Sequence, residues 1–145
     1  SVLCDDPVVY IDDRWLYHRE EALGKVSEVR LQDEGPRIVR RGQDLTIVGA
    51  GYSCYLAELV ANALSTSHAV SAEVVDIRVL NPLDPRVIVE SVKKTGKLVV
   101  LDGGWRTCGL SAEVIASVVE NTIVSHKPLR ITLPDAPAPT SKVLE

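Results

Sequence analysis

The stretch EVVDIRVLNPLD at residues 73–84 carries the signal that decides the fold. Its apolar first half predicts a buried strand over residues 73–77, and its second half leads to the start of a predicted helix. Asp84 suits the N-cap of that helix, and Pro85 suits the first helical position because its missing N–H would have no intrahelical partner. A second stretch, DGGW at residues 102–105, ends another apolar run. Ligands of α/β proteins usually bind at such strand ends, so we expect candidate functional residues at these two turns.

Apolar runs and helical periods alternate along the rest of the chain. We expect strands over residues 45–48, 73–77, 97–101 and 129–133, and a short edge strand over 37–40. Helical spacing predicts helices over residues 53–66, 85–95 and 109–123. Such an alternation predicts an α/β fold, in which a parallel sheet with right-handed crossovers has helices on both faces.

Each predicted helix has an apolar face that we expect to point inward. In the first helix this face consists of Leu56, Leu59, Val60, Ala63 and Leu64. The inward positions of the other two helices are Val87, Ile88, Val92, Leu110, Val114, Ile115, Val118 and Val119.

Length, charge and cysteine content exclude several classes of protein. The 145 residues suffice for one domain with a proper core, and the net charge of −4 argues against a general nucleic-acid binder. No apolar run approaches the roughly 20 residues that cross a bilayer, so we expect no membrane partner. The cysteines Cys4, Cys54 and Cys108 are odd in number and form no CxxC pair, so we expect a reducing, cytoplasmic compartment.

The N-terminal part of the chain differs from its centre. The chain has no Met and begins with SVL, so we interpret it as a fragment of a longer polypeptide; a processed mature chain is the alternative. Residues 7–11 predict a strand with no partner before it. Residues 12–36 are charged and aperiodic, with Trp15, Leu16 and Tyr17 as an apolar anchor.

One candidate binding motif is Gly49-Ala50-Gly51, which follows a predicted strand and opens a predicted helix. Glycines at such a turn let backbone N–H groups approach a pyrophosphate, and Asp76 ends the next strand, where a ribose-binding acid would lie. Cys54 stands where the third glycine of a dinucleotide fingerprint belongs. We therefore favour a plain tight turn, and keep a stand-alone, Rossmann-like dinucleotide-binding domain as the alternative function.

Metal-binding and nucleophilic residues give little signal. His18, His68 and His126 are scattered, with no acid or cysteine at metal-ligand spacing, so we predict no metal site. Cys54 lies in the first turn of a predicted helix, where the helix dipole would lower the pKa of its thiol. No His is nearby in sequence to act as a base, so we favour a small buried thiol.

Charged residues around the two turns form the candidate site. Asp76 and Arg78 alternate along one predicted strand and should point the same way. We expect Arg78 to pair with Asp84 or Asp102 and so to fix the strand ends. The alternative is a clamp for a ligand anion, which we favour less because no cluster of further donors accompanies Arg78.

The residues Gly103, Gly104 and Trp105 form a predicted loop. A large aromatic side chain in a loop either closes over the core or anchors an interface. Because Trp is enriched at binding hot spots, we give the interface equal weight.

Together these motifs resemble the C-terminal domain of the transketolase superfamily. The resemblance is closest to the β subunit of thiamine-diphosphate-dependent 2-oxo acid dehydrogenases of the pyruvate or branched-chain type, and it spans nearly the whole chain in order. The segments that carry it are 7–11 with Leu16-Tyr17, 38–48, 72–84, 91–100, 103–105 with Cys108-Gly109 and Ala112-Glu113, and 134–139.

The resemblance implies a three-layer α/β/α domain, with a mostly parallel five-stranded sheet and one antiparallel edge strand. Residues 1–17 would end a preceding pyrimidine-binding domain, 18–36 would be a linker, and 37–145 would be the C-terminal domain. The full enzyme would use thiamine diphosphate and Mg²⁺, and the acid that activates the cofactor would lie upstream of Ser1. We therefore expect no catalytic, cofactor-binding or metal-binding residue in this chain, which alone would be inactive.

The resemblance also implies partners, because in the family this domain packs subunits together. They are the chain's own pyrimidine-binding domain, a second β subunit, an α subunit and the acyltransferase component. We expect a role in the subunit interface or in shaping loops for Asp76, Arg78, Asp84, Asp102, Gly103, Gly104 and Trp105.

Three departures from the family pattern matter. Cys4 stands where relatives often carry an Asp near a monovalent-cation loop, so the cation is not carried over. His126-Lys127-Pro128 replaces an acidic residue with which some relatives grip the acyltransferase, which puts that docking mode in question. Relatives continue past Glu145 into another helix, and without it we expect an exposed apolar patch and self-association.

Overall fold

The computed structural model describes residues 6–20, 22, 30 and 33–137. A short 3-10 helix, η1 (Arg14–Leu16), precedes the main elements. The strands are β1 (Arg37–Arg40), β2 (Leu45–Gly49), β3 (Ala72–Asp76), β4 (Leu98–Trp105) and β5 (Leu129–Leu133). The helices are α1 (Tyr52–His68), α2 (Arg86–Thr95) and α3 (Leu110–Asn121). None of these described helices combines the length and the hydropathy that crossing a membrane requires.

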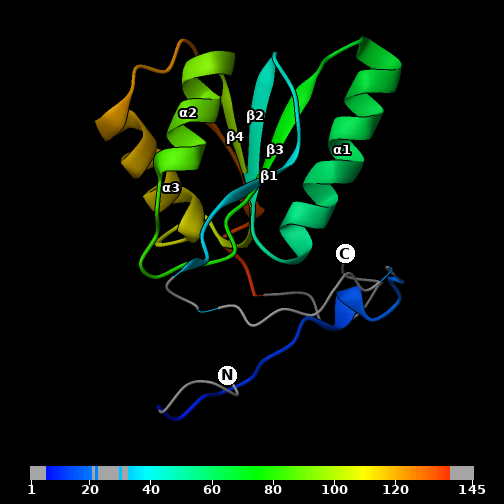
Figure 1. Ribbon diagram of the computed structural model, residues 1–145, viewed down its shortest axis with the longest axis vertical. Helices are drawn as coiled ribbons and strands as arrows, with labels where there is room; N and C mark the ends of the chain where they lie inside the picture. The colour runs from blue at the N-terminus through cyan, green and yellow to red at the C-terminus, as the bar shows by residue number, and fades with distance from the viewer. Residues whose placement is uncertain (1–5, 21, 23–29, 31–32, 138–145) are drawn as a thin grey trace.

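The strands form one sheet in the order β1-β3-β2-β4-β5. The pairs β2–β3, β2–β4 and β4–β5 are parallel, whereas β1 pairs with β3 in the antiparallel direction. Figure 1 shows α1 on one side of the sheet and α2 and α3 on the other. The expected three-layer α/β/α fold with one antiparallel edge strand is therefore confirmed. Its physical reason is that apolar parallel strands must be covered by helices on both faces of the sheet.

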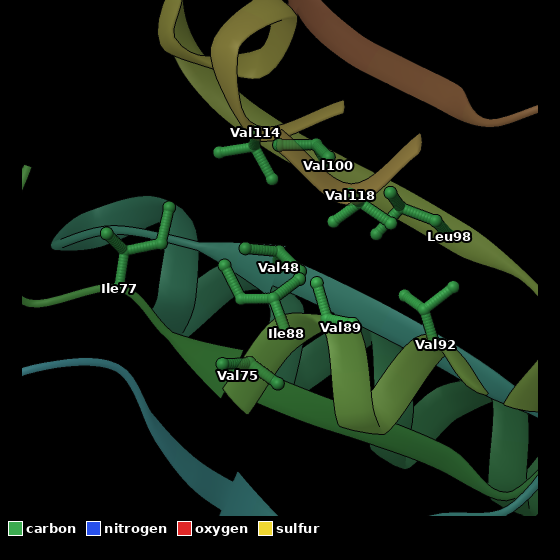
Figure 2. Packing of buried hydrophobic residues seen from close by; sticks show 10 residues of the cluster. All are labelled: Val48, Val75, Ile77, Ile88, Val89, Val92, Leu98, Val100, Val114 and Val118. Carbon is green, nitrogen blue, oxygen red and sulfur yellow. The ribbon is translucent and has the colours of Figure 1, made fainter. Parts of the chain in front are cut away.

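The core is formed by β-branched residues of the strands and apolar positions of the helices. Between the sheet and the α2–α3 layer, Figure 2 shows the strand residues facing the two helices. This cluster consists of Val48, Val75, Ile77, Ile88, Val89, Val92, Leu98, Val100, Val114 and Val118. The inward faces predicted for α2 and α3 are therefore confirmed in their main positions, although Val119 points to solvent.

The inward face of α1 agrees with the prediction only in part, because Leu56 and Leu64 pack against the core but the other predicted positions do not. Cys54, Ala57 and Ala61 are buried against the sheet, whereas Leu59 and Val60 are exposed. Small side chains let the helix lie close to β2 and β3, and the larger ones turn outward as a consequence. A hydrophobic period alone does not distinguish the two faces of a helix that is apolar on both.

Two further predictions are wrong in detail. Residues 7–11 form no strand in the described part of the chain, because no neighbouring strand offers hydrogen-bond partners to that backbone. Strand β4 runs on to Trp105, which pairs with Leu133 of β5, so the sequence DGGW ends a strand instead of forming a loop.

Candidate functional site

The predicted site residues lie around the carboxyl edge of the sheet. The parallel strands β2, β3 and β4 point the same way, and Gly49 is the register partner of Asp76. The loops that leave this edge contain the two turns found in the sequence. The edge therefore unites residues that are far apart in the chain.

Arg78 pairs with a residue that the sequence did not indicate. It lies beyond the end of β3, with a left-handed φ of 61°, and its guanidinium forms a salt bridge with Glu34. The predicted pairs with Asp84 and Asp102 are therefore wrong. The physical reason is that a left-handed residue breaks strand alternation and turns the side chain toward the segment before β1.

Asp76 is half-buried at the end of β3. Burial raises the pKa of its carboxyl group, while the backbone N–H of Arg78 and the charge of Arg37 oppose that rise. Arg37 is its register partner on β1. Asp76 thus helps to close the turn after β3 and faces the antiparallel edge strand.

Asp84 organises the start of α2. Its Oδ1 accepts a hydrogen bond from the backbone N–H of Arg86 at 3.0 Å, and its Oδ2 one from Arg86 Nη2 at 2.6 Å. These bonds hold the pKa of the Asp84 carboxyl below its usual range. The helix begins at Arg86 with Pro85 at the cap position, one residue later than predicted, but the carboxylate of Asp84 still satisfies an N–H group of the first turn.

Asp102 connects β4 to the start of α3. Its Oδ1 accepts from Gly104 N at 2.9 Å and its Oδ2 accepts from Ser111 N at 2.8 Å. The turn between them is tight, because a Cβ atom on Gly109 would lie 2.1 Å from the Trp105 carbonyl oxygen. One carboxylate therefore fixes the strand end and caps a helix whose own N-cap residue has no side chain.

Trp105 anchors the segment that follows β5. Its indole Nε1 donates to the carbonyl oxygen of Ala136 at 2.9 Å, and half of the side chain remains exposed. The side chain does not close over the core. An exposed aromatic surface with one fixed polar atom suits an interface.

The turn Gly49-Ala50-Gly51 is tightly closed. A Cβ atom on Gly49 would lie 2.8 Å from Cys54 N. The N–H groups of Ser53 and Cys54 donate to the carbonyl oxygens of Ala50 and Gly51 at 3.1 Å each. Because these amides already have acceptors, the glycines serve a tight strand-to-helix turn, as we favoured from the sequence.

Cys54 is a buried thiol. Burial above all, with the charges of Asp76 and Glu58, raises its pKa to about 12. The pKa of Cys54 is therefore raised, contrary to the lowered value considered from the sequence. Within the described residues, no three His, Cys, Asp or Glu side chains lie close enough to hold a metal ion.

Glu73 is a buried ionised group that sequence reasoning missed. Its Oε2 accepts from Gly42 N at 3.3 Å and pairs with Lys94 Nζ. Burial opposes ionisation, but hydrogen bonds from Lys94, Ser91 and Gly42 outweigh it, so the pKa of Glu73 lies below its ordinary value of 4.5. The signal was an acid at the second position of a strand whose next two residues, Val74 and Val75, are apolar.

A second missed feature ties the N-terminal segment to α1. Trp15 stacks on Tyr52 with a centroid distance of 5.9 Å, and Tyr52 contacts Tyr55 at 5.8 Å. The guanidinium carbon of Arg19 lies 4.2 Å from the centre of the Tyr55 ring. The predicted apolar anchor is therefore present only as the contact of Trp15 with Tyr52, and both Trp15 and Tyr17 remain exposed.

Two cavities flank β1, one beside the Glu73–Lys94 pair and the other beside Arg19 and Tyr55. One, of about 360 Å³, lies between β1 and α2 beside Glu73 and Lys94. The other, of about 370 Å³, lies between β1 and α1 beside Arg40 and Leu59. Neither of these two cavities is lined by Asp76, Arg78, Asp84 or the DGGW segment, so the residues predicted from the sequence form loop contacts outside both of them.

Comparisons with known proteins agree with this architecture. Residues 35–145 match the family described as "Transketolase, C-terminal domain". The mitochondrial pyruvate dehydrogenase E1 component subunit beta of Dictyostelium discoideum is 32% identical over 97% of this chain and 41% of that protein. Acetoin:2,6-dichlorophenolindophenol oxidoreductase subunit beta of Cupriavidus necator is 34% identical over 97% of this chain and 42% of that protein.

The same similarity extends to solved structures. One described as "Split gene transketolase, inactive beta4 tetramer" superposes with a TM-score of 0.64 and 27% sequence identity, covering 69% of this chain and 32% of that one. The chain spans about two fifths of the length of the curated relatives.

Proposed function

Because the chain belongs to the transketolase C-terminal domain family, we propose that it is the assembly and partner-docking domain of a thiamine-diphosphate-dependent enzyme. The enzyme would be the decarboxylating component of a 2-oxo acid dehydrogenase, with this domain in its β subunit. The observation that carries the proposal is the match over residues 35–145, combined with similarity to β subunits of pyruvate and 2-oxoisovalerate dehydrogenases. Thiamine diphosphate and Mg²⁺ would act outside the described residues.

The contacts at the carboxyl edge support a structural role for this domain. Asp84 and Asp102 each satisfy backbone N–H groups at a helix start, and Arg78 pairs with Glu34. Carboxylates engaged in this way hold loops in place and are not free to move protons. We therefore assign the predicted site residues to loop shaping, with the exposed face of Trp105 as the candidate subunit contact.

We also propose a division of the chain into residues 1–17, the end of a pyrimidine-binding domain, 18–36, a linker, and 37–145, the C-terminal domain. Val9, Tyr10 and Ile11 support it, because they are hydrophobic, lie outside regular secondary structure and are more than 80% exposed. Such a segment needs a partner surface. The pair Glu34–Arg78 then fixes the end of the linker to the domain.

The partners we propose are the preceding domain, a second β subunit, an α subunit and the acyltransferase component. For self-association the support is the related split-gene transketolase, whose structure is described as a β4 tetramer and as inactive. A β subunit that assembles without activity fits a domain whose task is assembly.

Titration calorimetry tests the proposal. Thiamine diphosphate with Mg²⁺, added to the 145-residue chain, should give no binding heat, whereas a longer polypeptide with the preceding domain and its α subunit should bind the cofactor and decarboxylate a 2-oxo acid. Micromolar binding of the cofactor by the 145-residue chain would contradict the proposal. Stabilisation by NAD in a thermal-shift assay would favour the dinucleotide-binding alternative instead.

A further inference from the structure

Strand β1 stands at an edge of the sheet, and one of its sides is unpaired among the described residues. It is the first strand in the order β1-β3-β2-β4-β5, and β3 is the only described strand that pairs with it. Such an edge presents a row of backbone N–H and C=O groups to which another extended chain can pair. Ile38 and Val39, in the middle of β1, are only partly buried. The outer side of β1 is therefore a place where one more strand can be added.

The two cavities described above lie on opposite faces of β1. Ile38 lines the cavity beside α2, whereas Val39 lines the cavity beside α1. Successive residues of a strand point to opposite faces, so a chain added beside β1 would direct its side chains alternately toward the two cavities. Neither cavity is lined by a residue of β5, the strand at the other edge. This arrangement matches strand addition, in which backbone hydrogen bonds provide affinity and alternate pockets provide specificity.

The edge formed by β1 is basic. Arg37, Arg40 and Arg41 lie within five consecutive residues that contain no acid, although the whole chain has a net charge of −4. Charged side chains on an edge strand can also serve only to prevent aggregation. That explanation requires no cavity and no unused hydrogen-bond donor beside the strand, so the surroundings of Arg40 and Arg41 distinguish the two explanations.

Arg40 and Arg41 each keep hydrogen-bond donors without an acceptor. Arg41 lines the cavity beside α2 and forms no hydrogen bond or ion pair with another described residue. Arg40 lines the cavity beside α1 and donates to Asn62, yet its buried Nε has no acceptor among the described residues. A buried donor without an acceptor costs free energy, and carboxylates form strong, charge-assisted hydrogen bonds with a guanidinium. Both cavities therefore favour an acidic side chain.

We propose that the outer side of β1 binds an extended segment of a partner protein as an additional strand, and that this segment mixes acidic with apolar residues. The acidic side chains would pair with Arg40 and Arg41, and the apolar ones would lie against the middle of β1. A segment with an acid at every position suits the site less well, because Glu58 lines the cavity beside α1 and Glu90 the cavity beside α2. This surface is separate from the exposed face of Trp105, so the inference goes beyond the proposed function.

A second copy of this chain suits the edge less well than a different partner. If β1 paired with β1 of another copy, the arginines of the two strands would lie close to one another, and like charges across a strand pair are destabilising. The described residues after β5 leave from the opposite edge of the sheet, where Trp105 holds the carbonyl oxygen of Ala136. An acidic segment of another protein meets neither difficulty, because it starts outside this chain and brings charge of the opposite sign.

Titration calorimetry with a model peptide tests this inference on the 145-residue chain. The probe is the acetylated and amidated peptide EEVVEE, in which paired acidic and paired apolar residues give both faces of the added strand each kind of side chain. It should bind with a dissociation constant below about 1 mM at low salt. The charge-reversed peptide KKVVKK should bind at least about tenfold more weakly, because its charge has the wrong sign. EEVVEE with every amide N-methylated should lose as much affinity, because it lacks the backbone N–H donors.

Charge reversal on the protein gives the matched test. Arg41→Glu should weaken the binding of EEVVEE at least about tenfold, because a guanidinium partner of the peptide is replaced by a like charge. The control is Arg106→Glu, which makes the same change at an exposed residue just after β4 and should leave the dissociation constant unchanged. Circular dichroism of both variants checks that they keep the secondary structure of the wild type.

Amide hydrogen exchange locates the bound peptide without any substitution. EEVVEE should slow the exchange of N–H groups within residues 37–41 and leave those of β5 unchanged. The inference is overturned if the wild type does not bind EEVVEE, if the N-methylated peptide binds as tightly, or if protection appears only at β5. Unchanged binding by a folded Arg41→Glu variant would overturn it as well. None of these measurements involves thiamine diphosphate, so the cofactor titration tests the proposed function separately.

Discussion

Replacement of Lys94 by Met should reveal what stabilises the buried carboxylate of Glu73. Glu73 is fully buried, whereas the Lys94 side chain is 34% exposed. Removing one partner of a buried ion pair costs about 3–5 kcal/mol, and the partial exposure of Lys94 reduces our expectation to about 2–3 kcal/mol at pH 7. Gly42 N–H still reaches the carboxylate at 3.3 Å. The Tm should fall by roughly 6–10 °C.

The pH dependence of this loss carries the stronger test. In the wild type the pKa of Glu73 is lowered below 4.5 in the folded state, so its contribution is present above the unfolded-state pKa and is lost only as the pH falls through the lower folded-state value. Without Lys94, burial dominates and the folded-state pKa rises above the unfolded-state one. As the pH falls from 7 toward 5, Glu73 of the variant should become protonated, which removes the destabilisation caused by its unpaired buried charge. Glu73 of the wild type stays ionised over the same pH range.

Urea unfolding followed by circular dichroism at pH 7 and pH 5 measures both effects. The stability gap between wild type and Lys94→Met should narrow at pH 5. The neighbouring Lys93→Met is the matched control, because its partner Glu90 is 70% exposed and the pair should contribute under about 0.5 kcal/mol. If the difference in unfolding free energy between wild type and Lys94→Met stays constant or widens at pH 5, the reasoning about Glu73 is refuted.

Two further predictions concern the loop after β4 and the cysteines. Asp102→Ala should lower the free energy of unfolding by about 2 kcal/mol in urea titrations, because two backbone N–H groups lose their acceptor. Asp102→Asn should lower it less. A loss below about 0.5 kcal/mol for the alanine variant would contradict this role of Asp102. With Cys4 replaced by Ser, an aromatic disulfide reagent at pH 8 should react quickly with the exposed Cys108, but with Cys54 only after unfolding, because burial raises the pKa of Cys54 to about 12. Rapid modification of both thiols in the native protein would count against that burial.

The strands and helices were predictable because their signals are local. The apolar runs at residues 45–48 and 129–133 correspond to β2 and β5, and the αL glycine Gly96 ends α2 as its position suggested. The family resemblance, carried by short motifs at the same turns, agrees with the match over residues 35–145.

The contacts of the candidate site were not predictable in the same way. Alternation suggested that Asp76 and Arg78 share a face, but the strand ends between them and the backbone turns left-handed at Arg78. Its partner Glu34 lies in an aperiodic segment, which no local pattern can position.

The sequence by itself determined the layers of this protein, the direction of its strands and its family, because hydrophobic period and turn residues act over a few neighbouring positions. The tertiary structure decided which side of α1 faces the sheet, which partner Arg78 takes and where Leu129 and Ile131 are left bare. These depend on close packing between elements distant in the chain. A helix that is apolar on two sides turns its small residues inward because the sheet lies close, and only the folded chain makes that choice.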